Sequence, residues 1–470
     1  MKRIIHALKE RGYETYIVGG AVRDILLGKQ PIDYDLVTFA QPDEVKAIAL
    51  SNGWKTINVG KAFGVIVVVI GGISYEVATA RTEWYGEDSH RPAGVHFANS
   101  IDADLARRDF TVNAMAMDIN GRLIDPFGGQ KDLEAGIIRT VGSAEARFKE
   151  DALRMFRAGR FAAQLGFKID SEIIEAVPKA LYRTSGLSLE RVRNEIEKIL
   201  IAPYAQIGLD YLVRSGLGNA TCKYRHYGTD YQVEILPELL RLPGVQQNPR
   251  YHYYDVWGHT LEAISWIPAD ITLRWAALPH DIAKGLPGVR ELNDQGEITD
   301  HGHDKVGAEI ADKILTRLQV SAPIRERVVW LLKNHMIHFP TKENVVRWLK
   351  KRAKSFSSQE QLKKAVSQLV ALRRADIIAS GYGSDGLCDL IEQEKVLNGA
   401  LATIPFYVQE LKIKGGEIAK VLGKGPQVSR FQQNLLERVI AGQLPNRRDS
   451  LLDALSRKAE RIKKKEELAK

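Results

Sequence analysis

The spacing of hydrophobic and polar positions changes once along the chain, near residue 140. Before that point short apolar runs alternate with amphipathic segments, and we predict strands at Tyr16–Val18, Tyr34–Thr38, Val65–Ile70, Ser74–Ala78 and Ala114–Asp118. Beyond Ser143 apolar residues recur at the spacing of one helix face, and the chain is predicted to stay helical. The pattern therefore predicts an α+β protein, with a mixed α/β head at residues 1–140 and an all-helical remainder.

Two interruptions of the helical spacing indicate where this remainder divides. A segment rich in Pro, Gly and Asn lies at Leu242–Tyr253, and the sequence SGYGSD breaks the period at Ser380–Asp385. We therefore expect a helical neck and body at residues 141–245, a further helical domain at 246–385 and a helical tail at 386–470.

Length, charge and cysteine content narrow the class of protein. A chain of 470 residues is too long for one core, and its formal charge of +9 favours a polyanionic partner such as a nucleic acid. Cys222 and Cys388 lie far apart, which argues against a disulfide framework and a cysteine zinc site. No apolar run reaches bilayer length and the chain opens with charged residues, so we expect a cytoplasmic protein with no membrane partner.

The first functional pattern is IVGGAVRDILLGKQPIDYDLVT, in which two aspartates follow a glycine pair. Asp33 and Asp35 are two residues apart on a predicted strand, so both carboxylates should point to one face. Such carboxylates repel each other unless they share a cation, and their oxygens suit Mg²⁺, which serves phosphoryl transfer. Gly19 and Gly20 would let backbone N–H groups approach a triphosphate. Glu76 is either a third carboxylate of this site or an exposed strand residue.

The order G-G-x-V-R-D and then D-x-D resembles the nucleotidyltransferases of the DNA polymerase β superfamily. Within it, the chain resembles the class II tRNA nucleotidyltransferases and their bacterial poly(A) polymerase relatives, most strongly over residues 16–200. The resemblance implies a polymerase β-like head that adds CCA to tRNA 3′ ends without a nucleic-acid template. It implies CTP and ATP as substrates, pyrophosphate as product, Asp33 and Asp35 as catalytic Mg²⁺ ligands, and a tail that binds tRNA.

A second motif, ARRDFTVNAMA, carries groups that suit a nucleotide. Arg107 and Arg108 are expected to bind phosphate oxygens, because a guanidinium makes paired, charge-assisted bonds to them. Asp109 and Asn113 lie four residues apart and would share a face at a helix start. The resemblance assigns these two side chains to the ribose of the incoming nucleotide.

The segment EDALRMFRAGRF carries a third motif of the family. Asp151 and Arg154 are three residues apart, so we expect them on one helical face. The resemblance implies that they bind the Watson–Crick edge of CTP or ATP and so replace a nucleic-acid template. The nucleotide-binding residues that we expect are Gly19, Gly20, Arg23, Arg108, Asp109, Asn113, Asp151, Arg154, Arg157 and Arg160.

The helical half carries histidines in an order that indicates a second site. His259, the doublet His280-Asp281 and Asp376 resemble the metal site of an HD domain, which would occupy residues 246–385. Imidazoles with carboxylates suit a transition metal or Mg²⁺ that activates water for phosphoester hydrolysis. We therefore expect these four residues to bind a divalent metal, whose identity the sequence leaves open, and we expect phosphohydrolase activity.

Two more histidines are secondary candidates in this domain. His303 and His335 would serve a second metal or a substrate phosphate. Pro279 and Ala283 depart from the residues that usually flank the His-Asp doublet, but they leave the ligands intact.

The segment Glu83–Phe97 bears on which product the resemblance implies. It is polar and aperiodic, and it resembles the flexible loop that CCA-adding members need to select ATP after two cytidines. Its full length favours complete CCA addition over the alternatives, an enzyme that adds only A or only CC. A poly(A) polymerase is less favoured, because the arginine-rich segment typical of that group is absent. A non-catalytic RNA-binding protein is the alternative from another class, and the intact carboxylates argue against it.

Overall fold

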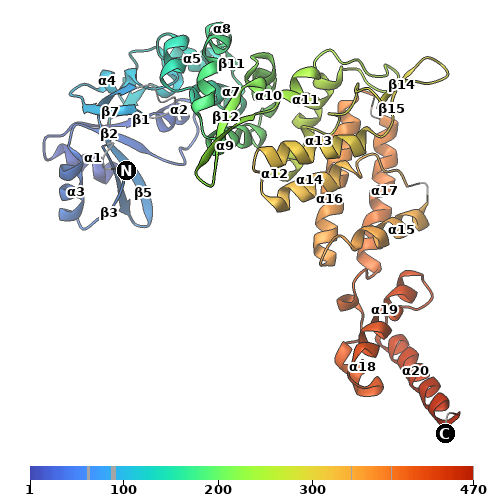
Figure 1. Cartoon of the computed structure of the whole chain (residues 1–470). Coiled ribbons are helices and arrows are strands. Elements are labelled where there is room, and N and C mark those ends of the chain that lie inside the picture. Colours follow the sequence, from blue (N-terminus) through green and yellow to red (C-terminus); the bar gives the residue numbers. More distant parts are fainter. Residues whose placement is uncertain (61–63, 86–91, 340, 383, 469–470) are drawn as a thin grey trace.

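The computed structural model describes residues 1–60, 64–85, 92–339, 341–382 and 384–468. The chain runs from a head that contains the N-terminus, through a helical body, to a tail that contains the C-terminus (Figure 1). The tail projects at a steep angle from the line that joins the head to the body, so the molecule has the outline of a hook (Figure 1).

The head is built on a seven-stranded sheet in the order β3-β4-β5-β2-β1-β8-β9. Its strands are β1 (Thr15–Val18), β2 (Asp35–Thr38), β3 (Lys55–Gly60), β4 (Val65–Ile70), β5 (Ile73–Thr79), β8 (Ala116–Met117) and β9 (Leu123–Ile124). Its helices are α1 (Lys2–Lys9), α2 (Gly20–Leu26), α3 (Pro42–Ser51), α4 (Ile101–Ala106) and α5 (Gly129–Ala135). Strands β2 and β5 pair in parallel, and the other pairs of this sheet are antiparallel. The predicted mixed α/β head is confirmed, and β3 and β9 are additional strands.

The structure corrects the position of Asp33. Strand β2 begins only at Asp35, and Asp33 lies in the bend before it, so the two aspartates do not alternate along one strand. The physical reason is that β1 ends at Val18, which pairs with Asp35, and Gly19 at φ +69° then turns the chain into α2, so the residues before Asp35 have no β1 partner.

The predicted loop at Glu83–Phe97 is a hairpin wherever the structure describes it. Strands β6 (Arg81–Tyr85) and β7 (Pro92–Phe97) pair antiparallel, with Thr82 opposite His96. Across the same pair the Trp84 ring stacks on His96 with their centroids 4.5 Å apart. Residues 86–91, the middle of the segment, lie outside the described residues. The flanks are therefore ordered by strand pairing, which the polar composition of the segment conceals.

The remainder of the chain is mostly helical, as predicted. The neck and body contain α6 (Ala144–Glu150), α7 (Leu153–Leu165), α8 (Ser171–Ala180), α9 (Leu189–Leu200) and α10 (Ala205–Arg214). Next come α11 (Val256–Trp266), α12 (Ile271–Ala277), α13 (His303–Arg317), α14 (Ala322–Leu332), α15 (Lys342–Ala353), α16 (Gln359–Ala379) and α17 (Ser384–Thr403). The tail contains α18 (Gly415–Leu422), α19 (Pro426–Ile440) and α20 (Arg448–Leu468). Short 3₁₀ turns lie at η2 (Thr111–Asn113), η3 (Leu181–Gly186), η4 (Leu217–Asn219), η5 (Pro237–Arg241) and η6 (Val408–Glu410).

Among the described residues, the prediction that this remainder is all-helical is wrong in three places. A hairpin joins β12 (Thr221–His226) to β13 (Thr229–Glu234), because Tyr227 and Gly228 both adopt positive φ, as a tight two-residue turn requires. A second hairpin joins β14 (Arg290–Leu292) to β15 (Ile298–Asp300). Two-residue strands β10 (Ile137–Ile138) and β11 (Lys168–Ile169) pair in parallel near α7.

Separate apolar cores hold the parts of the molecule together. The head has its own clusters around Leu36 and Val37, and the tail has one around Leu435. One continuous cluster extends from Phe110 to Phe406 and so joins the neck, the body and the next helices. The fourfold domain division stays a prediction. No described helix is both long and apolar enough to span a bilayer.

Candidate functional site

A cavity of about 570 Å³ opens between the head sheet and α7. Every residue predicted to bind the nucleotide lines it, together with Asp35 of the predicted Mg²⁺ pair. The lining residues are Gly19, Gly20, Arg23, Asp35, Glu83, Arg107, Arg108, Asp109, Asn113, Asp151, Arg154, Arg157, Arg160, Phe161 and Gln164. Segments far apart in sequence therefore meet at one site, although the role of each side chain stays a prediction.

Gly19 shapes the floor of this cavity. Its φ of +69° is a conformation that side-chain-bearing residues rarely adopt. A Cβ at this position would also lie 2.8 Å from Nη1 of Arg108. The glycine therefore permits both the turn from β1 into α2 and the close approach of the Arg108 guanidinium.

Three carboxylates lie near one another at the start of β2, and of these Asp35 lines the cavity whereas Asp33 and Glu76 are not among the lining residues. Asp35 and Glu76 are directly opposite in the parallel pair β2–β5, and Asp33 precedes β2. Although Asp35 is exposed at the rim, partial loss of hydration raises its pKa, the negative charge of Asp33 adds to the rise, and Arg108 opposes it. The pKa of Glu76 is raised in the same way, by partial desolvation and by both aspartates. Such mutual repulsion is relieved by a bound cation, so these residues fit Mg²⁺.

Two arginines of the cavity orient the side chains that are predicted to bind the ribose. Nη1 of Arg23 donates to Oδ1 of Asn113 at 2.7 Å, and Nε of Arg157 donates to Oδ2 of Asp109 at 2.7 Å. Burial alone would raise the pKa of Asp109, but Arg157 and Arg154 lower it. Asp109 and Asn113 do not share a helix, because Asp109 precedes the 3₁₀ turn Thr111–Asn113. Both nevertheless face the cavity, since ion pairing and the turn orient them.

Asp151 and Arg154 also depart from the predicted helical face. Helix α6 ends at Glu150 and α7 begins at Leu153, so Asp151 lies between them and accepts the backbone N–H of Leu153 at 2.9 Å. The buried Arg154 donates to Glu150 at 2.7 Å and to the carbonyl oxygen of Arg107 at 3.1 Å. Burial raises the pKa of Asp151. Both side chains line the cavity, and these bonds fix the Arg154 guanidinium without a ligand.

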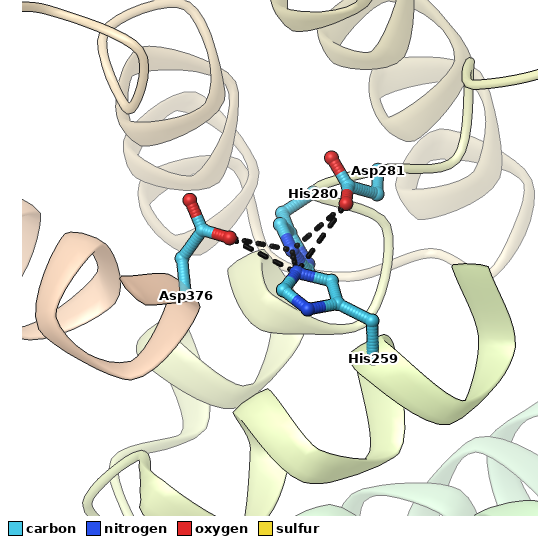
Figure 2. Close-up of side chains that lie close together, drawn as sticks. All are labelled: His259, His280, Asp281 and Asp376. Carbon is cyan, nitrogen blue, oxygen red and sulfur yellow. Dashed lines mark hydrogen bonds and ion pairs between the residues drawn. The ribbon is translucent and has the colours of Figure 1, made fainter. Parts of the chain in front are cut away.

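A second cluster lies among the helices beyond the body (Figure 2). His259 comes from α11, Asp376 from α16, and His280 and Asp281 from the turn after α12. The Nε2 atom of His259 lies 2.9 Å from Oδ1 of Asp376 and 3.1 Å from Nε2 of His280. Oδ2 of Asp281 lies 3.4 Å from the Nε2 atoms of both His259 and His280. The four predicted metal ligands therefore converge, with their ligand atoms within 4.8 Å of one another.

The charges in this cluster are those that a metal site requires. Burial would raise the pKa of Asp281, but Lys284, at 2.7 Å, and the histidines lower it. The pKa of Asp376 is likewise lowered, by hydrogen bonds from His259 and His280. Two ionised carboxylates thus face imidazole nitrogens in a buried site, and a divalent cation fits this donor set.

Comparison with known proteins places the chain in a family. Residues 15–139 match the model of the poly A polymerase head domain, 166–221 match the model described as a probable RNA and SrmB-binding site of polymerase A, and 256–380 match the HD domain. A CCA-adding enzyme of Lactiplantibacillus plantarum is 32% identical over 459 residues, which cover 96% of this chain and 94% of the relative. The chain belongs to the family of CCA-adding enzymes.

Other members of this family resemble the chain over part or all of its length. A CCA-adding enzyme of a Geobacillus species is 51% identical over 214 residues, and this match covers 46% of the chain and about half, 52%, of the relative. The crystal structure of the Bacillus stearothermophilus CCA-adding enzyme in complex with CTP has 29% identity and a TM-score of 0.64, and covers 98% of both chains. The resemblance inferred from the sequence is therefore confirmed, and so are the mixed head and the mostly helical remainder.

Besides Asp35, four lining residues of the cavity were not among the predicted nucleotide-binding set. Arg107 belongs to the predicted phosphate motif, whereas Phe161 and Gln164 follow Arg157 and Arg160 around the same face of α7, and this spacing is the signal that would have found them. The Arg160 guanidinium stacks over the Phe161 ring, with its carbon 4.2 Å from the ring centroid.

Glu83 had no such signal in the sequence. It reaches the cavity from hairpin strand β6, and its carboxylate accepts bonds from Arg81 at 2.8 Å and from Arg107 at 2.9 Å. Only the folded hairpin brings this residue to the nucleotide motifs, so its position depends on tertiary structure alone.

Proposed function

We propose that this protein adds CCA to tRNA 3′ ends without a nucleic-acid template, using CTP and ATP and releasing pyrophosphate. The observation that carries the proposal is the single cavity that joins Asp35 to every residue expected to hold the nucleotide. The CTP complex of the Bacillus stearothermophilus relative, at 29% identity, supports CTP as a ligand. The cavity volume of about 570 Å³ is in the range of small-molecule and cofactor sites.

Each group in the cavity has a role in this reaction. Asp33 and Asp35 would hold Mg²⁺, which supplies positive charge beside the triphosphate and the attacking hydroxyl. Arg23 and Arg108 donate to phosphate oxygens, and Asp109 and its neighbours position the ribose. The 3′ hydroxyl oxygen of the tRNA forms a bond to the α-phosphorus as the bond to the β-phosphate oxygen breaks, and pyrophosphate leaves.

The base of the nucleotide is selected by the protein. Arg154 offers N–H donors and Asp151 carboxylate acceptors, and this pair complements the donor and acceptors on the edge of cytosine. The bonds of Arg154 to Glu150 and to the Arg107 carbonyl fix its direction before the nucleotide enters. A preorganised pair of this kind discriminates between bases, because a wrong base leaves polar groups without partners.

The tail supplies a surface for the polyanionic partner, tRNA. A groove of about 970 Å³ between α19 and α20 includes several cationic residues and one carboxylate, Asp453. The cationic residues are Arg430, Arg438, Arg457, Lys458 and Arg461. Binding through phosphate contacts of this kind weakens steeply as salt concentration rises.

The test uses tRNA transcripts that end before, within and after CCA, each incubated with CTP, with ATP and with both. Complete addition predicts that CTP alone extends the first transcript by two cytidines and that ATP then completes it. Products that end in CC despite ATP would identify a CC-adding enzyme, and extension only of transcripts that already end in CC would identify an A-adding enzyme. Long adenosine tails would identify a poly(A) polymerase.

We further propose that the HD domain hydrolyses a phosphoester with a divalent metal held by His259, His280, Asp281 and Asp376. The convergence of these four buried or half-buried groups supports this second function. A 2′,3′-cyclic phosphate at a damaged tRNA end is the first substrate to test, because its hydrolysis begins to restore the hydroxyl that the head extends. Hydrolysis of this end and of bis(p-nitrophenyl) phosphate should require an added divalent ion, and absence of hydrolysis with Mg²⁺, Mn²⁺, Co²⁺, Ni²⁺ and Zn²⁺ would contradict the proposal.

A further inference from the structure

Most of the net positive charge of the chain lies in one short segment, residues 341–364. This segment contains eight Lys and Arg residues and two Glu residues, a net charge of +6 out of the +9 of the whole chain. It comprises α15 and the beginning of α16, and it lies inside the region that matches the HD domain. The cations are Lys342, Arg347, Lys350, Lys351, Arg352, Lys354, Lys363 and Lys364.

Four of these cations lie on one solvent-exposed face of α15. Arg347, Lys350, Lys351 and Lys354 are all exposed, and each is three or four residues from another, which is the spacing of neighbours on one side of a helix. The opposite face is apolar and is buried in the core, with Trp348 among its residues. That apolar face is therefore not free to enter a lipid bilayer, and α15 offers only its charged face to a partner.

The charges on this face lack anionic partners within the protein. Among the described residues, none of the four cations forms an ion pair with a carboxylate. Like charges at this spacing destabilise a helix, because neighbouring side chains repel each other. An array of anions outside the protein would remove this repulsion, and phosphate groups spaced along a nucleic acid are such an array.

The position of α15 indicates a long ligand. Its last residue, Ala353, accepts a hydrogen bond from Oη of Tyr407 at 2.9 Å, and Tyr407 directly precedes the turn η6 that leads into the tail. The nucleotide cavity is lined by residues of α7, which lies at the other end of the helical region (Figure 1). A ligand whose end lies in the cavity must therefore extend along the body to reach α15, as a folded RNA can.

We propose that the exposed face of α15 binds the phosphate backbone of tRNA through Arg347, Lys350, Lys351 and Lys354. The inference rests on the proposed function in taking tRNA as the substrate, and it adds a surface on the HD domain to the groove in the tail. Contacts to phosphates hold an RNA without reading its sequence. The four cations should therefore contribute to the affinity for tRNA and have no part in the choice of nucleotide.

The test removes the four charges from the full-length protein as Arg347→Gln/Lys350→Gln/Lys351→Gln/Lys354→Gln, because glutamine is a good helix former. Binding of a tRNA transcript is measured by filter retention at increasing KCl concentration. Each lost phosphate contact removes about 0.7–0.9 from the slope of log affinity against log salt concentration, so the slope should become shallower by about three. The KM for tRNA should rise, whereas kcat and the KM for CTP should not change.

A matched control removes four exposed cations of the head that line neither the cavity nor the groove of the tail. This control is Lys2→Gln/Lys9→Gln/Arg11→Gln/Lys55→Gln, and it should keep the salt dependence of the parent. Arg347→Lys retains the charge and should also keep it. Urea denaturation of each variant shows whether its stability is that of the parent.

An unchanged slope in the four-glutamine protein would overturn the inference, even if the parent adds CCA. An equal change in the head control would show that only the net charge matters, and would overturn it as well. Loss of binding to phosphatidylserine vesicles together with an unchanged slope for tRNA would assign the surface to a membrane instead. A parent that shows the expected change of slope but adds no nucleotide would contradict the proposed function and leave the RNA-binding surface in place.

Discussion

The nucleotide cavity and the HD cluster are suited to ligands of opposite charge, an anionic nucleotide and a metal cation. In the cavity, Arg157 already pairs with Asp109, at 2.7 Å, and Arg160 with Glu195, at 2.8 Å, so these two arginines have anionic partners before a ligand enters. In the HD cluster, two carboxylates and two imidazoles converge, with their ligand atoms within 4.8 Å of one another. A site for a large anion that enters and leaves keeps its shape through internal ion pairs. A site for a small cation instead brings carboxylate oxygens and imidazole nitrogens close together, although Lys284 already pairs with Asp281 at 2.7 Å.

The comparison predicts that the two sites can be inactivated separately, and the head gives the largest effect. Asp33→Ala or Asp35→Ala should reduce nucleotide addition on the order of 10³-fold or more, because several kcal/mol of transition-state stabilisation depend on the metal they hold. Binding of tRNA, measured by filter retention, should change little, since the cationic residues proposed to bind it line the groove of the tail and the exposed face of α15. Phosphoester hydrolysis should be unchanged. Turnover of the double alanine variant near the parent rate would remove the head from its role.

The second prediction concerns substitutions in the HD cluster in place of the head. His280→Ala with Asp281→Ala should remove metal and phosphoester hydrolysis, because the four-ligand cluster loses two of its ligands. CCA addition by the same protein should stay within about twofold of the parent, a change of less than 0.5 kcal/mol in the barrier. His338→Ala is the matched control, because it removes an exposed histidine of the same domain that is not one of the four ligands, and it should retain both activities. Joint loss of both activities would show that the continuous core from Phe110 to Phe406 couples the two sites structurally.

Removal of metal should destabilise the HD domain and leave the cavity shape unchanged. A ligand that binds only the folded state, at a concentration one hundred times its dissociation constant, stabilises that state by about 2.7 kcal/mol. Chelation should therefore lower the temperature of an unfolding transition, measured by differential scanning fluorimetry, and Mn²⁺ should restore it. The His280→Ala/Asp281→Ala protein should not respond to Mn²⁺, and a full response in that protein would place the stabilising ion elsewhere.

The preference among nucleotides tests whether Arg154 and Asp151 select the base in place of a nucleic-acid template. Arg154→Lys keeps the charge but loses the planar donor set, and Asp151→Asn replaces an acceptor oxygen with a donor. Each change should lower the preference for CTP over UTP by about 10- to 100-fold, as expected for a pair worth roughly 1–3 kcal/mol of base discrimination. Incorporation of all four nucleotides is measured side by side. Unaltered selectivity in both variants would refute the assignment.

Much of the fold and of the candidate sites could be predicted from the sequence, because these features depend on residues that are close together or regularly ordered along the chain. Strands β1, β2, β4 and β5 follow from short apolar runs, and the four convergent HD ligands follow from the order of His and Asp along the chain. The break between α6 and α7 could not be predicted. The buried Phe148, Ala152 and Phe156 recur every four residues across it, so helical spacing continues although the helix stops. Glu83 reaches the cavity only through strand pairing, which leaves no local signal.

The last prediction concerns how the cavity keeps its shape without a ligand. Helix α7 carries Arg154 and packs on α10, with Gly159 of α7 against Gly208 of α10. A Cβ on Gly208 would lie 2.6 Å from the carbonyl oxygen of Gly159 and 2.8 Å from Cγ2 of Ile199. Gly208→Ala must therefore separate the helices, at a cost of about 1–3 kcal/mol typical of overpacking, and should weaken CTP binding as the wall of the cavity moves.

Gly399→Ala, within α17, is the matched control, because its Cβ would meet no atom within 4 Å. It should leave CTP binding unchanged and stabilise the protein by up to about 1 kcal/mol, since alanine favours a helix over glycine. Urea denaturation and CTP titration of both variants separate the two effects. If Gly208→Ala were as stable as Gly399→Ala and bound CTP normally, ion pairs alone would hold the cavity, and the close packing of α7 on α10 would have no part in its preorganisation.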